Sequence, residues 1–314
     1  MQTFQSPETA GEPDETESAG KTGEAESAGK TGNAIPPLSP GLYIVATPIG
    51  NLGDLSPRAA RVLAGVSLIA AEDSRVTAKL LHHIGARVPM LAYHDHSDER
   101  VRQTLVARAL QAPVALVSDA GTPLISDPGY KLVRDARAAG VNIVTIPGPC
   151  AAVAALTLAG LPTDRFLFAG FLPAKAAARA TAIAELAAIR ATLVLYESGP
   201  RLGASLAALA TGLGDRPAAV AREISKRFEE TVTGSLSELA ARYAEAPPRG
   251  EIVITIAPPA PPAAADGATL DAALAMAMAG ASLKSAVAEV TAALGLPRAA
   301  VYARALELRD GVAD

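Results

Sequence analysis

Residues 114–129 read VALVSDAGTPLISDPG, and this stretch decides the fold class of the chain. Residues 114–117 are four consecutive apolar residues, which is typical of a short strand buried on both faces, since a half-exposed strand would alternate apolar and polar residues. A turn rich in glycine and proline follows, and Asp127 and Pro128 open a predicted helix that Gly140 ends. A buried strand, a turn and a helix in this order predict one unit of a mostly parallel α/β sheet.

The same pattern recurs on both sides of this stretch. Four more apolar runs are expected to be strands of the same sheet: 42–46, 66–71, 88–93 and 142–146. A second unit has strand-like runs at 166–171, 192–196, 218–221 and 252–256, with an alanine-rich helix near 175–189. For a chain of 314 residues we therefore predict an α/β fold with two domains, 41–160 and 161–257.

Composition changes at both ends of the chain. Residues 1–40 carry a net charge of −5 and repeat the sequence ESAGKTG at 17–23 and 26–32, which predicts a disordered acidic tail. The GKT triplets in it lack the earlier glycine that a phosphate-binding loop requires. A stiff Pro/Ala linker is expected at 258–267, followed by a helical extension at 268–314. The extension is predicted to contain three short helices: 269–278, 283–294 and 297–308.

The composition also argues against several kinds of protein. Cys150 is the only cysteine, which excludes a disulfide framework or a multi-cysteine metal site, and we expect it to be a small turn residue rather than a nucleophile. No G-x-G-x-x-G fingerprint for a dinucleotide is present. His94 and His96 have no obvious third partner, so a metal ion is not expected.

Charge and hydropathy favour a soluble, cytoplasmic protein. The longest apolar stretches, such as 151–161, are too short to span a bilayer. The net charge of the whole chain is −4, but residues 41–314 carry only about +1. A polyanionic partner would therefore have to be bound by a local patch rather than by the field of the whole protein.

Glycine and proline turns, or clusters of ionisable residues, follow each of the five strands predicted in the first unit. These segments are 47–54, 72–75, 94–96, 118–123 and 147–150. Ligands of open parallel sheets collect at the carboxyl ends of the strands, and glycine-rich turns allow main-chain N–H groups to approach a ligand closely. Any one of these turns could simply connect a strand to a helix, but five of them at one edge of the sheet predict a ligand site.

Two groups of charged residues each allow two interpretations. Glu72 and Asp73 could be paired carboxylates for acid–base chemistry, or Arg75 could neutralise one while the other caps the next helix. In the second unit, Tyr196-Glu197-Ser198 precedes Arg201, and Arg222, Lys226 and Arg227 lie close to Glu223. These basic residues could form solvated ion pairs or contact the phosphates of a nucleic acid.

Several motifs in the chain resemble those of a known family. They are TPIGNLGD (47–54), AEDSR (71–75), HDH (94–96), VSDAGTPLISDPG (117–129), PGPCA (147–151), GFLP (170–173), YES (196–198) and GE (250–251). In this order they closely resemble the bacterial 16S ribosomal RNA cytidine 2′-O-methyltransferases of the tetrapyrrole-methylase superfamily. Residues 282–308 resemble the small helix-turn-helix-like extension of many members.

The resemblance implies a two-domain tetrapyrrole-methylase-like fold that binds S-adenosylmethionine (SAM) in the cleft between its domains. It also implies a homodimer and 16S rRNA within the small ribosomal subunit as the substrate. By analogy with donor sites in the superfamily, the expected SAM contacts are Pro48, Asp119, Gly121, Thr122, Ile125, Cys150 and Ala151.

A ribose 2′-hydroxyl is a poor nucleophile until a base or a nearby cation favours its alkoxide. On the resemblance, the acids expected near this hydroxyl are Glu72, Asp73 and Asp95, and the residues expected to hold RNA phosphates are Arg75, Arg201 and Lys226.

Two other functions stay open at this point. A corrinoid or porphyrinogen C-methyltransferase shares the scaffold, but its branch typically carries G-x-G-P-G after the first strand, where this chain has 47-TPIGN-51. A non-catalytic SAM-sensing regulator could use the C-terminal helices to bind nucleic acid. Residues 266–314 carry a net charge of −2, which favours a packing or substrate-orienting role for these helices.

Overall fold

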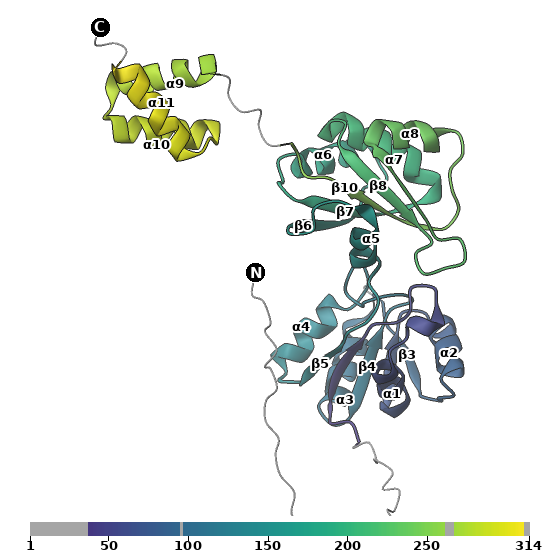
Figure 1. Ribbon diagram of the computed structural model, residues 1–314. Coiled ribbons are helices and arrows are strands. Elements are labelled where there is room, and N and C mark those ends of the chain that lie inside the picture. The colour runs from purple at the N-terminus through teal and green to yellow at the C-terminus, as the bar shows by residue number, and fades with distance from the viewer. Residues whose placement is uncertain (1–36, 95–96, 261–266, 311–314) are drawn as a thin grey trace, which may run out of the picture. The chain divides into compact units, whose positions relative to one another are not determined.

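The computed structural model describes residues 37–94, 97–260 and 267–310 (Figure 1). The acidic tail up to residue 36, Asp95, His96 and most of the predicted linker lie outside the described residues. Within the described ranges, no helix combines the length and apolar character needed to cross a membrane.

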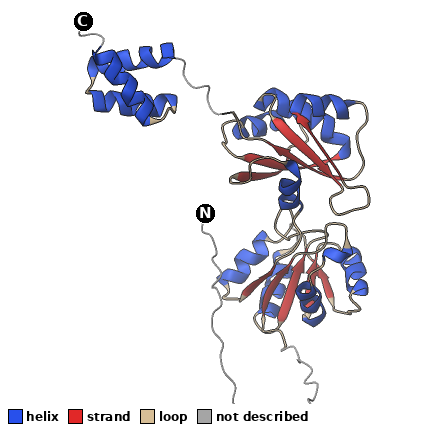
Figure 2. Ribbon diagram, viewed as in Figure 1, coloured by secondary structure: helices blue, strands red, loops and turns tan. Residues whose placement is uncertain are grey.

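The first sheet has five parallel strands in the order β3-β2-β4-β1-β5. Figure 2 shows its strands in red with helices, in blue, beside them. Its strands are β1 (Gly41–Val45), β2 (Leu68–Ala71), β3 (Met90–Ala92), β4 (Pro113–Val117) and β5 (Ile143–Ile146). The segments between them form α1 (Pro57–Gly65), α2 (Ser74–His83), α3 (Glu99–Ala109) and α4 (Tyr130–Ala138), with a short 3-10 helix, η1 (Leu52–Asp54), before α1. The predicted parallel α/β sheet is confirmed.

Both faces of the first sheet are covered by helices. Val45 of β1 packs with Leu63 of α1 on one face. Leu42 of the same strand packs on the other face with Leu105 of α3 and Leu132 of α4. Because successive side chains of a strand point to opposite faces, every position of such a strand has to be apolar. This is why the strands read as continuous apolar runs.

The helix after β4 begins later than the sequence predicts. Instead of starting at Asp127, α4 starts at Tyr130. Leu124 and Ser126 have φ angles of 74° and 62°, a left-handed backbone that a right-handed helix cannot contain. Residues 122–129 therefore remain an irregular turn at the carboxyl end of β4.

The second sheet is mixed and has the order β6-β7-β10-β8-β9. Its strands are β6 (Phe166–Phe171), β7 (Thr192–Ser198), β8 (Pro217–Arg222), β9 (Glu230–Ser235) and β10 (Glu251–Ile256). Only β6 and β7 run parallel, and the other neighbours are antiparallel. The sequence did not predict β9, because its sequence ETVTGS has no apolar run and it lies at the edge of the sheet.

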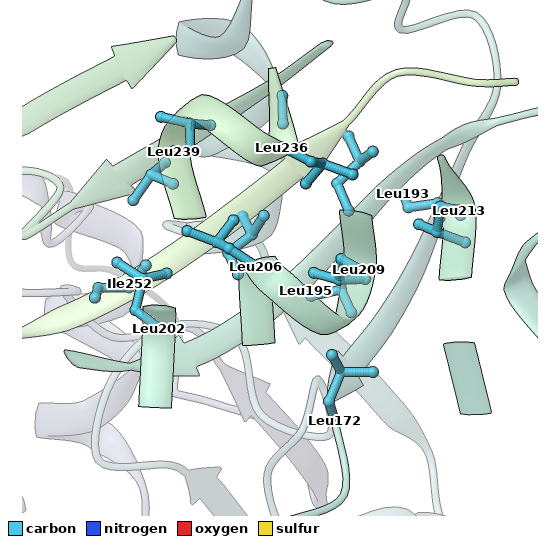
Figure 3. Packing of buried hydrophobic residues seen from close by; sticks show 14 of the residues in the cluster. Leu172, Leu193, Leu195, Leu202, Leu206, Leu209, Leu213, Leu236, Leu239 and Ile252 are labelled. Carbon is cyan, nitrogen blue, oxygen red and sulfur yellow. The ribbon is translucent and has the colours of Figure 1, made fainter. Parts of the chain in front are cut away.

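Helices pack on both faces of the second sheet. One face is covered by α6 (Ala176–Leu186), α7 (Gly199–Leu213) and α8 (Leu236–Ala244). Leu202 and Leu206 of α7 pack there against Leu195 of β7 (Figure 3). The other face is covered by α5 (Ala151–Ala159), which follows directly from the first sheet, and whose Ala155 packs with Val194 of β7.

The C-terminal helices form a core of their own. They are α9 (Gly267–Gly280), α10 (Leu283–Leu294) and α11 (Arg298–Asp310), which confirms the three predicted helices. Leu274, Val287 and Val301, one from each helix, are completely buried together. The guanidinium of Arg304 also holds both carboxylate oxygens of Asp271 at 2.7 and 2.6 Å. Packing in this shared core stabilises helices that would be only marginally stable on their own.

Candidate active site

A cavity of about 410 Å³ lies where the carboxyl ends of the first sheet's strands meet the second sheet. From the first half of the chain it is lined by Ile49, Glu72, residues 119–122 and 125–127, Cys150 and Ala151. From the second half it is lined by Phe171, residues 196–198, Ile224 and residues 250–253. The segments after β1, β2, β4 and β5 therefore meet as predicted, whereas no described residue after β3 lines the cavity. The volume is within the range of about 300–1,000 Å³ typical of small-molecule sites.

Hydrogen bonds, two between backbone groups and one from a side chain, join three strand ends at the base, or floor, of the cavity. Thr47, after β1, exchanges hydrogen bonds with Gly121, after β4: the Thr47 amide donates to the Gly121 carbonyl at 2.8 Å, and the Gly121 amide donates back at 3.1 Å. The Thr122 hydroxyl donates to the carbonyl of Pro149, after β5, at 2.9 Å. These bonds fix the turns relative to one another and leave their remaining polar groups for a ligand.

Gly121 is required by the geometry of this floor. Its φ angle is 79°, a left-handed conformation that residues with a Cβ rarely adopt. A Cβ at this position would also lie 3.3 Å from Cγ2 of Ile49 across the floor. The glycine thus allows both the turn and the close approach of the β1 and β4 ends.

Tyr196 of β7 links the second sheet to the start of α5. Its hydroxyl oxygen accepts a hydrogen bond from the Ala152 amide at 3.2 Å, so it satisfies one of the free N–H groups of the first helical turn. The rings of Phe168 and Phe171 contact the Tyr196 ring edge-on, with centroid distances of 4.8 and 5.6 Å. Burial raises the pKa of Tyr196 to about 12, so its phenol remains protonated at neutral pH.

The lining of the cavity is acidic. Five carboxylate residues contribute to it: Glu72, Asp119, Asp127, Glu197 and Glu251. Among the described residues that line it there is no lysine or arginine. Two of these carboxylates are paired with cations just outside the lining, Glu197 with Arg201 and Glu251 with Lys226. The charged groups of the lining itself are all acids, which favours a cationic or neutral, hydrogen-bond-donating ligand over a phosphate.

Glu72 and Asp73 have different surroundings. Glu72 lines the cavity, and its Oε2 accepts a hydrogen bond from the Asp119 amide at 3.3 Å. Asp73 does not line the cavity: it caps α2 through the Arg75 amide at 2.8 Å and forms an ion pair with the Arg75 guanidinium at 2.6 Å. The hydrogen bond from the Arg75 side chain is the main reason that the pKa of Asp73 falls to about 2. The second interpretation predicted that one acid would pair with Arg75 and that the other would cap the helix. In the structure Asp73 does both.

Arg201 is held by groups of the second half. Its Nε lies 3.3 Å from the buried carboxylate of Glu197, and one terminal nitrogen donates to the Leu172 carbonyl at 2.5 Å. Glu197 also accepts hydrogen bonds from the Ser198 amide at 2.8 Å and the Ser205 hydroxyl at 2.5 Å. The network fixes the start of α7, and Arg201 itself does not line the cavity.

Lys226 lies in the loop between β8 and β9 and is paired with two acids. Its Nζ lies 2.9 Å from Glu223 and 2.7 Å from Glu251. Burial opposes its charge, but the hydrogen bonds to Glu251 and Glu223 outweigh this effect and raise the pKa of Lys226. The neighbouring Ser225 hydroxyl contacts the carboxylate of Asp54 in η1, so this loop touches the loop after β1.

Six of the seven residues predicted to contact the donor line the cavity, and Pro48 does not. Asp95 lies outside the described residues. The predicted site residues did not include Phe171, Ile224 or residues 250–253. Phe171 and Ile224 lie at the carboxyl ends of strands but are apolar, whereas the prediction rested on ionisable residues and glycine turns; residues 250–253 lie at the amino end of β10. In an antiparallel sheet the amino end of β10 reaches the same edge as the carboxyl end of β7. An aromatic residue at the end of the predicted strand 166–171 was the available signal for Phe171.

Comparison with known proteins agrees with this geometry. The family description "Tetrapyrrole (Corrin/Porphyrin) Methylases" matches residues 41–240, and "RsmI C-terminal HTH domain" matches residues 264–309. A protein of Erythrobacter litoralis named ribosomal RNA small subunit methyltransferase I is 52% identical, over 87% of this chain and 97% of its own length. A protein of the same name from Mesorhizobium japonicum is 47% identical, over 87% of this chain and 94% of its own length.

Solved structures show the same fold at low sequence identity. A diphthine synthase has a TM-score of 0.54 and 18% identity, covering 69% of this chain and 89% of its own. Uroporphyrin-III-C-methyltransferase from Thermus thermophilus has a TM-score of 0.50 and 22% identity, covering 69% of this chain and 94% of its own. The family description matches residues 41–240, and the two relatives are 52% and 47% identical to this chain. The chain therefore belongs to the tetrapyrrole (corrin/porphyrin) methylase family of methyltransferases.

Proposed function

We propose that this enzyme transfers the methyl group of SAM to the ribose 2′-hydroxyl of a cytidine in 16S rRNA of the small ribosomal subunit. One observation carries the proposal: the 52% identical relative named for small-subunit rRNA methylation is matched over 97% of its length. The match therefore extends over both sheets and the C-terminal helices. The low-identity structural relatives share only the scaffold, which serves several substrates.

The residues of the cavity suit SAM. SAM supplies an electrophilic methyl group on a positively charged sulfur. The acidic lining favours that charge, and the turn at residues 119–122 and the first amides of α5, at Cys150 and Ala151, offer main-chain groups for the polar ends of the donor. Ile125 and Val253 supply apolar surface in the same cavity.

Three acids are expected near the 2′-hydroxyl, and of the two that the structure describes, Glu72 is better placed than Asp73 to accept its proton. Glu72 lines the cavity, and the hydrogen bond from the Asp119 amide orients one of its oxygens. Asp73 is occupied by the α2 cap and by Arg75, and its lowered pKa makes it a weak base. We therefore assign the role of general base to Glu72.

RNA phosphates are expected to bind outside the acidic cavity. Arg75 fits this role because its side chain is 87% exposed beside the segment that carries Glu72. At each of the three predicted residues a phosphate would have to compete with a carboxylate, since Arg75 is paired with Asp73 just as Arg201 and Lys226 are paired with acids. The side chains of Arg201 and Lys226 are, however, only 33% and 25% exposed. Arg75 is therefore our first choice for a phosphate contact.

The proposed function is tested by offering labelled SAM together with either small ribosomal subunits that lack the methyl group or uroporphyrinogen. We expect label in 16S rRNA, at a ribose and not at a base. Label in the tetrapyrrole would support the corrinoid and porphyrinogen alternative, and SAM binding without any transfer would indicate a sensor.

Replacing Glu72 by Gln removes the proposed base while keeping the size of the side chain. Because general-base catalysis contributes about 10²- to 10⁴-fold, we expect kcat to fall within that range. SAM affinity, measured by calorimetry, should fall far less than kcat, because four of the five carboxylates of the lining remain. Asp73→Asn and Asp95→Asn serve as comparisons with smaller expected losses; full turnover by Glu72→Gln would remove Glu72 from the mechanism.

The floor of the donor site can be tested with a matched pair of glycines. Gly121 and Gly85 have φ angles of 79° and 67°, so alanine at either position costs about 1–2 kcal/mol of backbone strain. At Gly85 a Cβ would have no atom within 4 Å, whereas at Gly121 it would press on Ile49. We expect both variants to lose stability in urea denaturation, and Gly121→Ala to lose somewhat more because of the contact with Ile49. Only Gly121→Ala should bind SAM more weakly, on the order of tenfold, which corresponds to about 1.4 kcal/mol.

We also infer that the protein is a homodimer and acts in the cytoplasm, where ribosomal subunits are assembled. Both inferences are supported by the family resemblance. Sedimentation velocity separates the 31.8 kDa chain from a particle of twice that mass, and the dimer should be the main species at micromolar concentration. A monomer at micromolar concentration would contradict the inference of a homodimer.

A further inference from the structure

Phe171 is an exposed aromatic residue in the wall of the cavity. It is the last residue of β6, it lines the cavity, and 56% of its surface is exposed. The nearby Phe168 packs with the buried residues between α5 and the second sheet. Phe171 is not part of this cluster. A large apolar ring left open to solvent inside a ligand cavity indicates a contact with a ligand.

A β-bulge turns the Phe171 ring toward the site. In the pairing of β6 with β7, Phe168 lies opposite Val194, but Gly170 lies opposite Leu195, so Ala169 is an extra residue. Gly170 has a φ angle of 65°, the left-handed conformation that allows the chain to bulge. In a regular strand, side chains three positions apart lie on opposite faces. Because of the bulge, Phe168 and Phe171 both contact the ring of Tyr196.

The contact with Tyr196 restrains the orientation of the Phe171 ring. The Tyr196 ring meets it edge-on at 66°, and Tyr196 is itself held by the hydrogen bond from the Ala152 amide. An edge-on partner on one side of a ring leaves a face available for stacking. The cavity thus contains a flat, pre-oriented aromatic surface.

The charge of the cavity indicates which part of an RNA can reach this surface. The acidic lining disfavours a phosphate, so the part that enters should be a neutral base with its ribose. Single-stranded RNA is recognised mostly by bases that stack on aromatic side chains. Carboxylates can also accept a hydrogen bond from the exocyclic amine of cytosine, which uracil lacks.

We propose that Phe171 binds the RNA substrate, with its ring stacked on the base of the nucleotide that receives the methyl group. This proposal rests on the proposed function and adds the residue that positions the target base. On this proposal the RNA base is bound at Phe171 of the second sheet, and SAM is bound at the turns of the first sheet that carry Gly121 and Cys150.

The first test compares Phe171→Leu, which keeps an apolar side chain but removes the ring, with Phe171→Tyr, which keeps the ring. Phe166→Leu is the matched control, since Phe166 lies on the same strand, is 49% exposed and does not line the cavity. Stacking energies predict that Phe171→Leu lowers kcat/KM for small ribosomal subunits by about 5- to 150-fold. SAM affinity should be unchanged, and Phe171→Tyr and Phe166→Leu should keep nearly full activity.

The second test uses fluorescence and does not depend on turnover. The chain contains no tryptophan, so Phe171→Trp places a single indole in the cavity wall, and Phe166→Trp places one outside it. We expect small subunits that lack the methyl group to quench Phe171→Trp and to leave Phe166→Trp unchanged. Quenching by SAM alone, together with loss of SAM affinity in Phe171→Leu, would mean that the ring stacks on the adenine of the donor and would overturn the proposal.

Two results distinguish failure of this inference from failure of the proposed function. If the unsubstituted chain transfers no methyl group to RNA, the proposed function is refuted and this inference with it. If the unsubstituted chain is active and Phe171→Leu is equally active, with no quenching in Phe171→Trp, the stacking role alone is refuted.

Discussion

The packing of α5 against the second sheet is the contact on which the cavity depends. The helix starts at Ala151, directly after the β5 end of the first sheet, and buries Ala152, Ala155 and Leu156 against β7, β8 and β10. Small side chains on this face let the helix lie close to the sheet, as tightly packed interiors require. The start of α5 is thereby held at the cavity, where its first amides are available and where Tyr196 reaches it.

The charge of the residues that line the cavity differs from the charge of the residues around it. The described charged residues that line the cavity are all acids, whereas Arg75, Arg201 and Lys226 lie outside the lining. Each of these three is paired with an acid, and Arg201 and Lys226 are paired with lining residues, Glu197 and Glu251. This arrangement agrees with the near-neutral charge of residues 41–314, because RNA would be bound by a few local contacts rather than by long-range attraction. Salt would then affect RNA binding more strongly than SAM binding.

The two sheets contribute different kinds of group to the site. The first sheet supplies turns whose backbone is fixed by hydrogen bonds between Thr47, Gly121, Thr122 and Pro149. The second sheet supplies side chains, with Tyr196 kept neutral by burial and Phe171 turned inward by a bulge. A rigid backbone floor suits a donor that is the same in every member of the family, and a wall of side chains can vary with the substrate.

The sequence by itself determined the features that depend on neighbouring residues. Continuous apolar runs predicted the parallel strands, and glycine and proline turns predicted which segments would meet at one edge, including Asp119, Gly121 and Cys150 of the cavity. The tertiary structure decided the features that depend on partners far along the chain. It showed that Glu72 rather than Asp73 faces the cavity, that β9 completes the second sheet, and that β10 brings its amino end to the site. The reason is physical: strand and turn propensities are local, whereas the direction of a side chain and the pairing of an edge strand depend on contacts between residues far apart in the sequence.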